Sequence, residues 1–324
     1  MKKAQENLKK LLEEACECVN ELFDVDINPS EFQLTISKRI GIRIYGRANV
    51  VEKTIEIDSK LLRKYKNKPG CLRGVLAEEI THIVRDEILR EKGIQTDCVV
   101  EEFFAHLAYL SAGGEEKGEK IMKYYLKHLF REFEVEEVEK GVEKIKNFVE
   151  LSFERLKNLL NLRDENLLSK EYFKFLKSFD GKIDKIANKL PVTAWKLLDE
   201  LLDTLKYCNS KILGRKVEEN LGVYQPNLKS VKTYIQATLE CLKKTAKDIV
   251  FYSLLEVEEA DPYLFNIKAH AIGYICAEKL FNEREKWKSW FYSKNQEAIR
   301  EELEKIFWEE VEKYKAWKKD KKQV

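Results

Sequence analysis

Strand-forming sequence is confined to one short part of this chain of 324 residues. After an amphipathic first segment, residues 28–30 interrupt the helical spacing, and three β-branched, partly alternating runs follow, QLTISKRI, IRIYGRANV and KTIEID. From residue 117 onward almost every segment repeats its apolar residues at helical spacing. We therefore expect an α+β fold that is predominantly α, with a single small sheet near the N-terminus.

The same change of pattern indicates how the chain is divided. We expect a small mixed head over residues 1–130, formed by the short sheet and the helices after it, and an all-helical domain over residues 131–324. Two helices of the head are predicted over residues 72–92 and 98–112, because Gly93 and the Gly-Gly pair after residue 112 are typical helix stops.

Composition argues against several classes of protein. The chain has 59 basic and 57 acidic residues, so the molecule as a whole has no field that would attract nucleic acid or a membrane. It has no long uncharged apolar run, and its first segment lacks the apolar centre of a signal peptide. The seven cysteines form no C-x-x-C pair, as expected for free thiols of a cytoplasmic protein. A charged fraction of 36%, dominated by Lys and Glu, resembles that of hyperthermophile proteins.

The segment LAEEITHIVRDE, residues 76–87, has metal-ligand types at helical spacing. Residues four apart lie on one face of a helix, so Glu78 and His82 can bind a common ion. Glu79 is turned by roughly 100° around the axis, where a base beside the metal is expected rather than a ligand. Because a glutamate oxygen is an accepted zinc ligand, this motif predicts a metal site that needs a third ligand from elsewhere.

Two other interpretations of this segment stay open from the residues alone. An E-E-x-x-H pattern arises easily by chance on a helix of a chain this rich in glutamate. Glu79-x-x-His82 is also half of a di-iron site of the ferritin-like kind, which requires a second such motif and two further glutamates in a four-helix bundle. No second E-x-x-H stands at a corresponding position, so we rank this interpretation lower.

The next predicted helix contains VEEFFAH, and the two helices together resemble those of the gluzincins. In the thermolysin-like members of this family of zinc peptidases, the helices read H-E-L-T-H and N-E-x-x-x-D. The resemblance implies that Glu79 is the general base and that His82 and Glu102 are zinc ligands. It also places Glu101 and His106 at the two positions whose side chains support the ligand histidines.

This chain departs from the family pattern at two positions whose side chains touch in the family. Where the family has a ligand histidine held by an aspartate, this chain has Glu78 opposite His106, with donor and acceptor exchanged. Such a partner fixes the orientation of a ligand and tunes its basicity. Two alternatives remain: a slip of one residue would make Glu101 the ligand instead of Glu102, and His106 would otherwise be a core histidine.

The resemblance also covers the sheet and one late helix. Gluzincins place an edge strand beside the cleft, where an extended peptide is added as another strand. Here Tyr45–Val50 would be that edge. The segment DPYLFNIKAHAIGYICAEKLF also resembles the late helix of several helical metallopeptidases, in which a Tyr or His faces the scissile carbonyl. This resemblance makes His270, Tyr263 and Tyr274 candidates, with core packing as the alternative for His270. His128 has no acidic residue at metal spacing and is expected to be structural.

These expectations define a function and an alternative. The first is a metallopeptidase-like protein that hydrolyses peptide bonds with Glu79 as base and a metal on Glu78, His82 and Glu102. We expect Zn²⁺, with Mn²⁺ or Fe²⁺ competing because two carboxylates favour harder ions. The alternative is a non-catalytic module of the same fold that binds a protein partner. Substrate and oligomeric state are not indicated.

Overall fold

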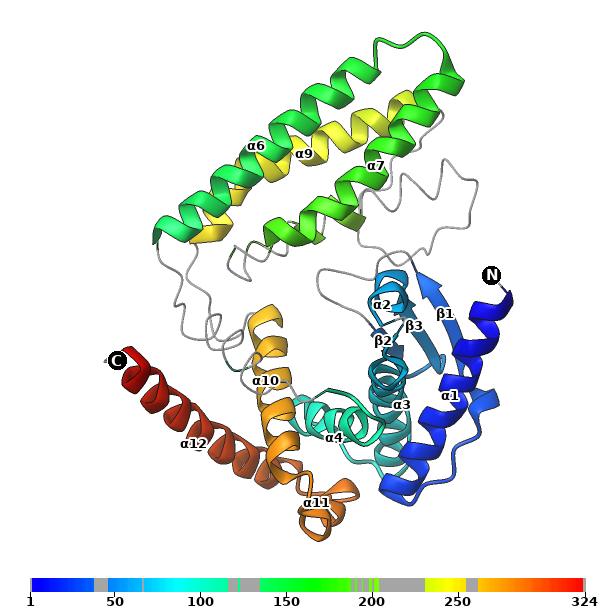
Figure 1. The fold of residues 1–324 in the computed structure, drawn as a ribbon, viewed down its shortest axis with the longest axis vertical. Coiled ribbons are helices and arrows are strands. Elements are labelled where there is room, and N and C mark those ends of the chain that lie inside the picture. Colours follow the sequence, from blue (N-terminus) through cyan, green and yellow to red (C-terminus); the bar gives the residue numbers. More distant parts are fainter. Residues whose placement is uncertain are drawn as a thin grey trace. The chain divides into compact units, whose positions relative to one another are not determined.

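The computed structural model describes residues 2–37, 46–65, 67–115, 122, 135–187, 190, 194, 198–199, 201–203, 231–254 and 262–322. Their elements, in chain order, are α1 (Lys2–Phe23), the short 3₁₀ helix η1 (Pro29–Glu31), β1 (Gln33–Ser37), β2 (Gly46–Asn49), β3 (Thr54–Asp58), α2 (Ser59–Lys64), α3 (Pro69–Glu91), α4 (Cys98–Ser111), α6 (Val135–Leu159), α7 (Glu165–Ala187), α9 (Val231–Leu254), α10 (Pro262–Leu280), α11 (Arg284–Phe291) and α12 (Gln296–Lys322) (Figure 1). The predicted class, α+β and mainly α, is confirmed. No described helix is both long and apolar enough to cross a membrane.

The strands form a sheet in the order β1-β3-β2, so β3 is central and β2 lies at an edge within the described part. β1 runs parallel to β3 and β2 antiparallel to it. The side chain of Asn49 accepts hydrogen bonds from the backbone N–H groups of Val51 and Glu52, both at 3.1 Å, which closes the turn between β2 and β3. β2 therefore covers most of the predicted edge, while Tyr45 lies outside the described residues.

The two helices that follow have local start and stop signals. α3 has Pro69 in its first turn and is followed by Gly93, whose φ is 64°. α4 begins after Asp97, whose carboxylate accepts from the N–H groups of Val99 and Val100 at 2.9 and 3.3 Å, and Gly113 follows it with φ 90°. Both helices therefore lie close to the predicted ranges 72–92 and 98–112.

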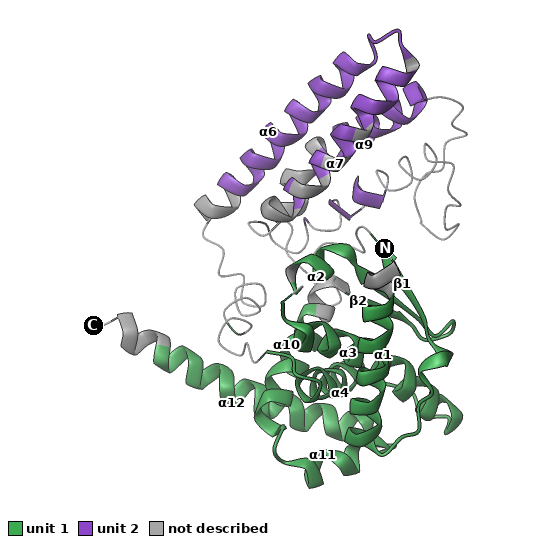
Figure 2. Cartoon of the chain, turned by 45° about the vertical axis from the view of Figure 1, so that its right-hand side comes forward, with its two compact units in different colours: residues 1–40, 44–129, 265–324 green, residues 41–43, 130–264 purple. Residues whose placement is uncertain are grey.

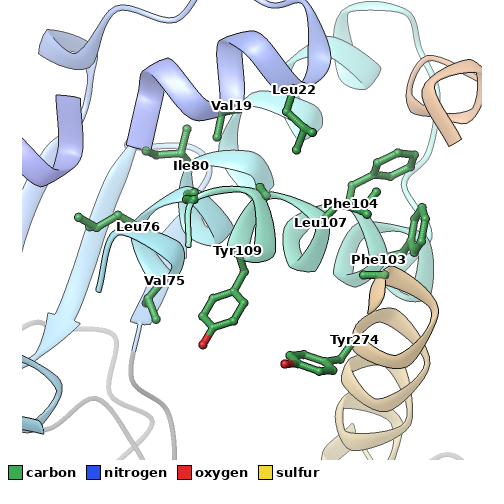
Figure 3. Packing of buried hydrophobic residues seen from close by; sticks show 14 of the residues in the cluster. Val19, Leu22, Val75, Leu76, Ile80, Phe103, Phe104, Leu107, Tyr109 and Tyr274 are labelled. Atoms are coloured by element: carbon green, nitrogen blue, oxygen red, sulfur yellow. The ribbon is translucent and has the colours of Figure 1, made fainter. Parts of the chain in front are cut away.

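Apolar side chains of α1, α3, α4 and α10 form the core around these helices. Figure 3 shows members of the cluster: Val19 and Leu22 of α1; Val75, Leu76 and Ile80 of α3; Phe103, Phe104, Leu107 and Tyr109 of α4; and Tyr274 of α10. The aromatic rings of Phe23 and Phe291 stack with centroids 4.3 Å apart, which joins α1 to α11. The core therefore includes helices from both ends of the sequence.

The chain forms two compact units (Figure 2). One contains residues 1–40, 44–129 and 265–324, and the other contains residues 41–43 and 130–264. The predicted division had placed all of 131–324 in one helical domain, whereas the last sixty residues cluster with the N-terminal part. Helical spacing shows which face of a helix is apolar but not which segment covers it. His128 lies outside the described residues.

The second unit is described through α6, α7 and α9. Apolar residues of α6, such as Ile145 and Val149, are buried. The hydroxyl oxygen of Tyr172 on α7 lies 2.6 Å from Oγ1 of Thr238 on α9, so a buried hydrogen bond joins these two helices. Among the described residues, one group of side chains could hold a metal ion, and it lies in the first unit.

Candidate metal centre

A cavity of about 350 Å³ is lined by β2, α3, α4 and α10. Most of the residues singled out in the sequence line it, namely Glu78, Glu79, His82, Glu101, Glu102 and His270. A larger hollow of about 1220 Å³ lies between α1, η1 and β1, and its described lining mixes apolar residues with Lys9, Glu13 and Glu17 but contains no histidine. Of these two, the smaller cavity is therefore the one that brings histidines together with carboxylates.

The carboxylate of Glu102 lies between three imidazoles. Its Oε2 atom is 2.7 Å from Nδ1 of His270 and 3.8 Å from Nε2 of His106, and its Oε1 atom is 3.9 Å from Nε2 of His82. Burial alone would raise the pKa of Glu102, but the histidines outweigh burial and lower this pKa to about 2. Glu102 is therefore an ionised carboxylate at the centre of the cluster.

His106 connects that carboxylate to Glu78. Its Nδ1 atom lies 3.5 Å from Oε1 of Glu78, while its Nε2 atom faces Glu102. Glu78, Glu102, His106 and His270 each offer a ligand atom, and all these atoms lie within 4.8 Å of one another. These four residues could therefore hold a metal ion.

A glycine on α10 brings His270 to this cluster. A Cβ atom on Gly273 would lie 2.6 Å from the carbonyl carbon of Glu102 and 2.7 Å from its Cβ, too close for any side chain. The backbones of α10 and α4 therefore approach closely at Glu102. His270 lies three residues earlier on the same helix, which places its ring beside the Glu102 carboxylate.

Glu79 is buried between α3 and β2. Its carboxylate occupies the space where a side chain of Gly46 would begin, and the backbone N–H of Ala48 donates to it. Burial, together with the carboxylates of Glu78 and Glu102, raises the pKa of Glu79 well above its usual value. Glu79 therefore binds a proton more strongly than an exposed glutamate does.

Burial and the neighbouring carboxylates shift the pKa values of the two histidines of the cavity in opposite directions. Burial opposes a charge on His270, but the carboxylates of Glu102, Glu78 and Glu79 raise its pKa to about 9. Burial lowers the pKa of His82, and the attraction of Glu102 does not reverse this effect. In the metal-free protein the charge therefore resides on His270.

Glu101 forms an ion pair with Arg85, a residue that the sequence analysis did not single out. Arg85 is fully buried. Its guanidinium group lies 4.6 Å from the centroid of the Phe104 ring and donates a hydrogen bond to Oε1 of Gln296 at 2.9 Å. Glu102, rather than Glu101, therefore faces the histidines. The available signal in the sequence was the position of Arg85 on the helix, three residues after His82. This signal could not identify a buried arginine, because exposed arginines also occur on charged helices.

Tyr274 lies behind the cluster. Its hydroxyl donates to the backbone carbonyl of Glu115 at 2.8 Å, and its ring meets the ring of His106 edge to face at 5.0 Å. Figure 3 shows Tyr274 on α10 opposite Tyr109 of α4. The hydroxyl is thus engaged with the backbone, and the role of Tyr274 as a donor to substrate stays a prediction.

The donor set suits a divalent cation. Carboxylate oxygens and imidazole nitrogens bind Zn²⁺ at about 2.0–2.2 Å. Two such donors of one ion therefore lie up to about 4 Å apart, in line with the separations around Glu102.

No family model, curated protein or solved structure matches this chain.

Proposed function

We propose that the protein is a metal-dependent hydrolase that cleaves peptide bonds in the cavity between β2, α3, α4 and α10. The observation that carries this proposal is the position of Glu79, a buried carboxylate beside a group of glutamates and histidines that could hold a metal ion. A general base next to a Lewis acid is the pairing that metal-assisted hydrolysis requires.

The ligands proposed for the ion are Glu78, His82 and Glu102. Glu78 and His82 stand one turn apart on α3, and His82 lies 3.9 Å from Oε1 of Glu102. Zn²⁺, Mn²⁺ and Fe²⁺ all accept such donors, and two carboxylates shift the preference toward the harder ions. When bound, the ion would polarise the scissile carbonyl and acidify a water molecule.

Side chains and backbone of this chain would transfer the proton and bind the peptide substrate. Glu79 would accept the proton of the attacking water and transfer it to the leaving amine. Its raised pKa makes it a stronger base than an exposed glutamate. The cavity is also lined by Gly46, Arg47 and Ala48 of edge strand β2, along which an extended peptide could add as another strand.

The alternative function, a module that binds a protein partner without catalysis, is supported by a different observation. Glu78 faces His106 at 3.5 Å and Glu102 faces His270 at 2.7 Å, so the cluster could neutralise its own charges without an ion. Metal content separates the two functions, since only the hydrolase requires an ion.

The test compares wild type, Glu79→Gln and Glu91→Gln, each purified without chelator. Metal is measured by plasma mass spectrometry and hydrolysis with an unstructured peptide library. We expect metal in all three proteins, hydrolysis in wild type, and at least a hundredfold loss in Glu79→Gln because its base is removed. Glu91 is exposed at the end of the same helix, so Glu91→Gln should retain activity. Absence of both metal and hydrolysis in wild type would favour the binding module.

A further inference from the structure

His270 of α10 belongs to the group of side chains that could hold an ion, although it lies far from the other members in the sequence. Its Nδ1 atom is 2.7 Å from Oε2 of Glu102, and the ligand atoms of Glu78, Glu102 and His270 lie within 4.8 Å of one another. His82 is not a member of that group, and its Nε2 atom lies 3.9 Å from Oε1 of Glu102. Of these two histidines, His270 therefore has the closer contact with the carboxylate.

The packing of α10 on α4 determines where His270 lies. A Cβ atom on Gly273 would be 2.6 Å from the carbonyl carbon of Glu102, so the two backbones meet at this point. Residues three or four apart share one face of a helix, so His270 lies on the face of α10 that meets α4. Tyr274 lies on the same face, is buried, and meets the ring of His106 at 5.0 Å. His270 is therefore positioned beside Glu102 by a packed helix.

The separation of His270 and Glu102 suits two ligands of one ion. Donors about 2.0–2.2 Å from an ion, at right angles around it, lie about 3 Å apart, close to the 2.7 Å between Nδ1 and Oε2. In the metal-free protein His270 donates a hydrogen bond to Glu102. An ion would replace the proton of that hydrogen bond, and the proton would pass to solvent, because a ligand imidazole is neutral.

We propose that His270 is a ligand of the ion, together with Glu78 and Glu102, so that the ion joins α10 to α3 and α4. This inference rests on the proposed metal centre and adds to it a ligand from the C-terminal part of the chain. With His82 the ion then has four protein ligands. Four ligands fill a tetrahedral Zn²⁺ site, whereas octahedral Mn²⁺ keeps positions for water and substrate. His270 therefore makes Mn²⁺ the ion better suited to hydrolysis.

The first test measures Mn²⁺ binding by wild type, His270→Ala and His270→Gln. The full-length proteins are stripped with chelator, dialysed and titrated with Mn²⁺ alone, and free Mn²⁺ is followed by electron paramagnetic resonance. A glutamine can still donate to Glu102 but has no imidazole nitrogen, so His270→Gln separates a ligand from a residue that only orients Glu102.

We expect both variants to bind Mn²⁺ about a hundredfold more weakly than wild type, a larger loss than most supporting residues cause. Lys279→Ala removes a half-exposed side chain of the same helix and should bind Mn²⁺ as wild type does. A Kd of His270→Gln within about tenfold of the wild-type Kd, or no binding of Mn²⁺ by wild type, would overturn the proposal.

The second test needs no substitution and decides the question if a variant fails to fold. An ion that joins α10 to two other helices should slow amide hydrogen exchange in Pro262–Leu280 of wild type by about tenfold or more. Exchange in α10 that is the same with and without Mn²⁺ would overturn the proposal.

Failure of this inference differs from failure of the proposed function. Hydrolysis in wild type, combined with Mn²⁺ binding that His270→Gln leaves intact, would overturn the role of His270 and leave the hydrolase intact. Mn²⁺ binding that requires His270, without any hydrolysis, would establish the ligand and overturn the hydrolase.

Discussion

The Nδ1 atom of His106 on α4 lies 3.5 Å from Oε1 of Glu78 on α3, so this histidine and this glutamate face each other across the two helices. In the gluzincin pattern these two positions hold a histidine and an aspartate. The contact makes the exchange testable as a pair, because substitutions of touching residues are expected to be non-additive.

We expect the double variant Glu78→His/His106→Asp to bind Zn²⁺ more tightly than the sum of the single effects predicts. Glu78→His alone places two imidazoles face to face, and these can share a hydrogen bond only when one donates and the other accepts. Adding the aspartate restores an acceptor for the new ring. Titration calorimetry of the four proteins should give a coupling of about 1 kcal/mol. Simple additivity would show that the two residues do not act together.

Gly273→Ala should destabilise the protein even though alanine favours helices over glycine by about 1 kcal/mol. The new methyl group would lie 2.6–2.7 Å from backbone atoms of Glu102 and Phe103, so α10 must move away from α4. We expect a loss of roughly 1–3 kcal/mol in the free energy of unfolding, measured with urea, and weaker metal binding. Lys279→Ala, at a half-exposed position of the same helix, should cost under about 0.5 kcal/mol. Unchanged stability in Gly273→Ala would contradict the close approach.

Two arginines of α3 provide a matched comparison of burial. Arg85 is fully buried against Glu101, and Arg90 is exposed five residues later. Arg85→Met should cost roughly 3–5 kcal/mol because it leaves the Glu101 carboxylate buried without its cation. Arg90→Met should change the free energy of unfolding by under about 0.5 kcal/mol. Adding Glu101→Leu to Arg85→Met should recover most of the loss, and a failure to recover would show that packing of the guanidinium dominates.

The histidines of the metal-free cavity should titrate far apart. The pKa of His270 is raised to about 9 and that of His82 is lowered. A raised pKa in the folded protein means that the charge on His270 contributes stability fully below its unfolded pKa of roughly 6.5, and that this contribution disappears as pH rises through about 9. NMR of ¹³C-histidine-labelled protein should show one resonance titrating near pH 9, absent in His270→Gln. Urea unfolding should show that this variant loses less stability than wild type between pH 6.5 and 9.

The parts of the fold that were predictable from sequence have local causes. The ends of α3 and α4 follow from Asp97 and from Gly93 and Gly113, and the strands from β-branched alternation. Spacing on one helix also placed Glu78 with His82. In each case the information lies within a few residues of the feature that it determines.

What was not predictable depends on distant partners. Arg85 is buried only because Glu101, Gln296 and Phe104 surround it, and the sequence contains no local mark of that environment. Likewise, helical spacing could not show that α10 packs on α4, so His270 entered the list of candidates only through a resemblance. His106 was predicted to support Glu78, but its position between Glu78 and Glu102 required the structure.

The discontinuity of the first unit has a consequence for the order in which the cavity is completed during synthesis. Glu78 and Glu102 leave the ribosome early, but His270 follows only after residues 130–264 have been made. The cluster of possible ligands is therefore incomplete on any nascent chain that lacks α10. Closing so long an intervening loop costs only about 0.6 kcal/mol more than closing one of half its length, so the delay arises from timing and not from thermodynamics. The growing polypeptide is thereby kept from assembling its full ion-binding group until its last helices are available.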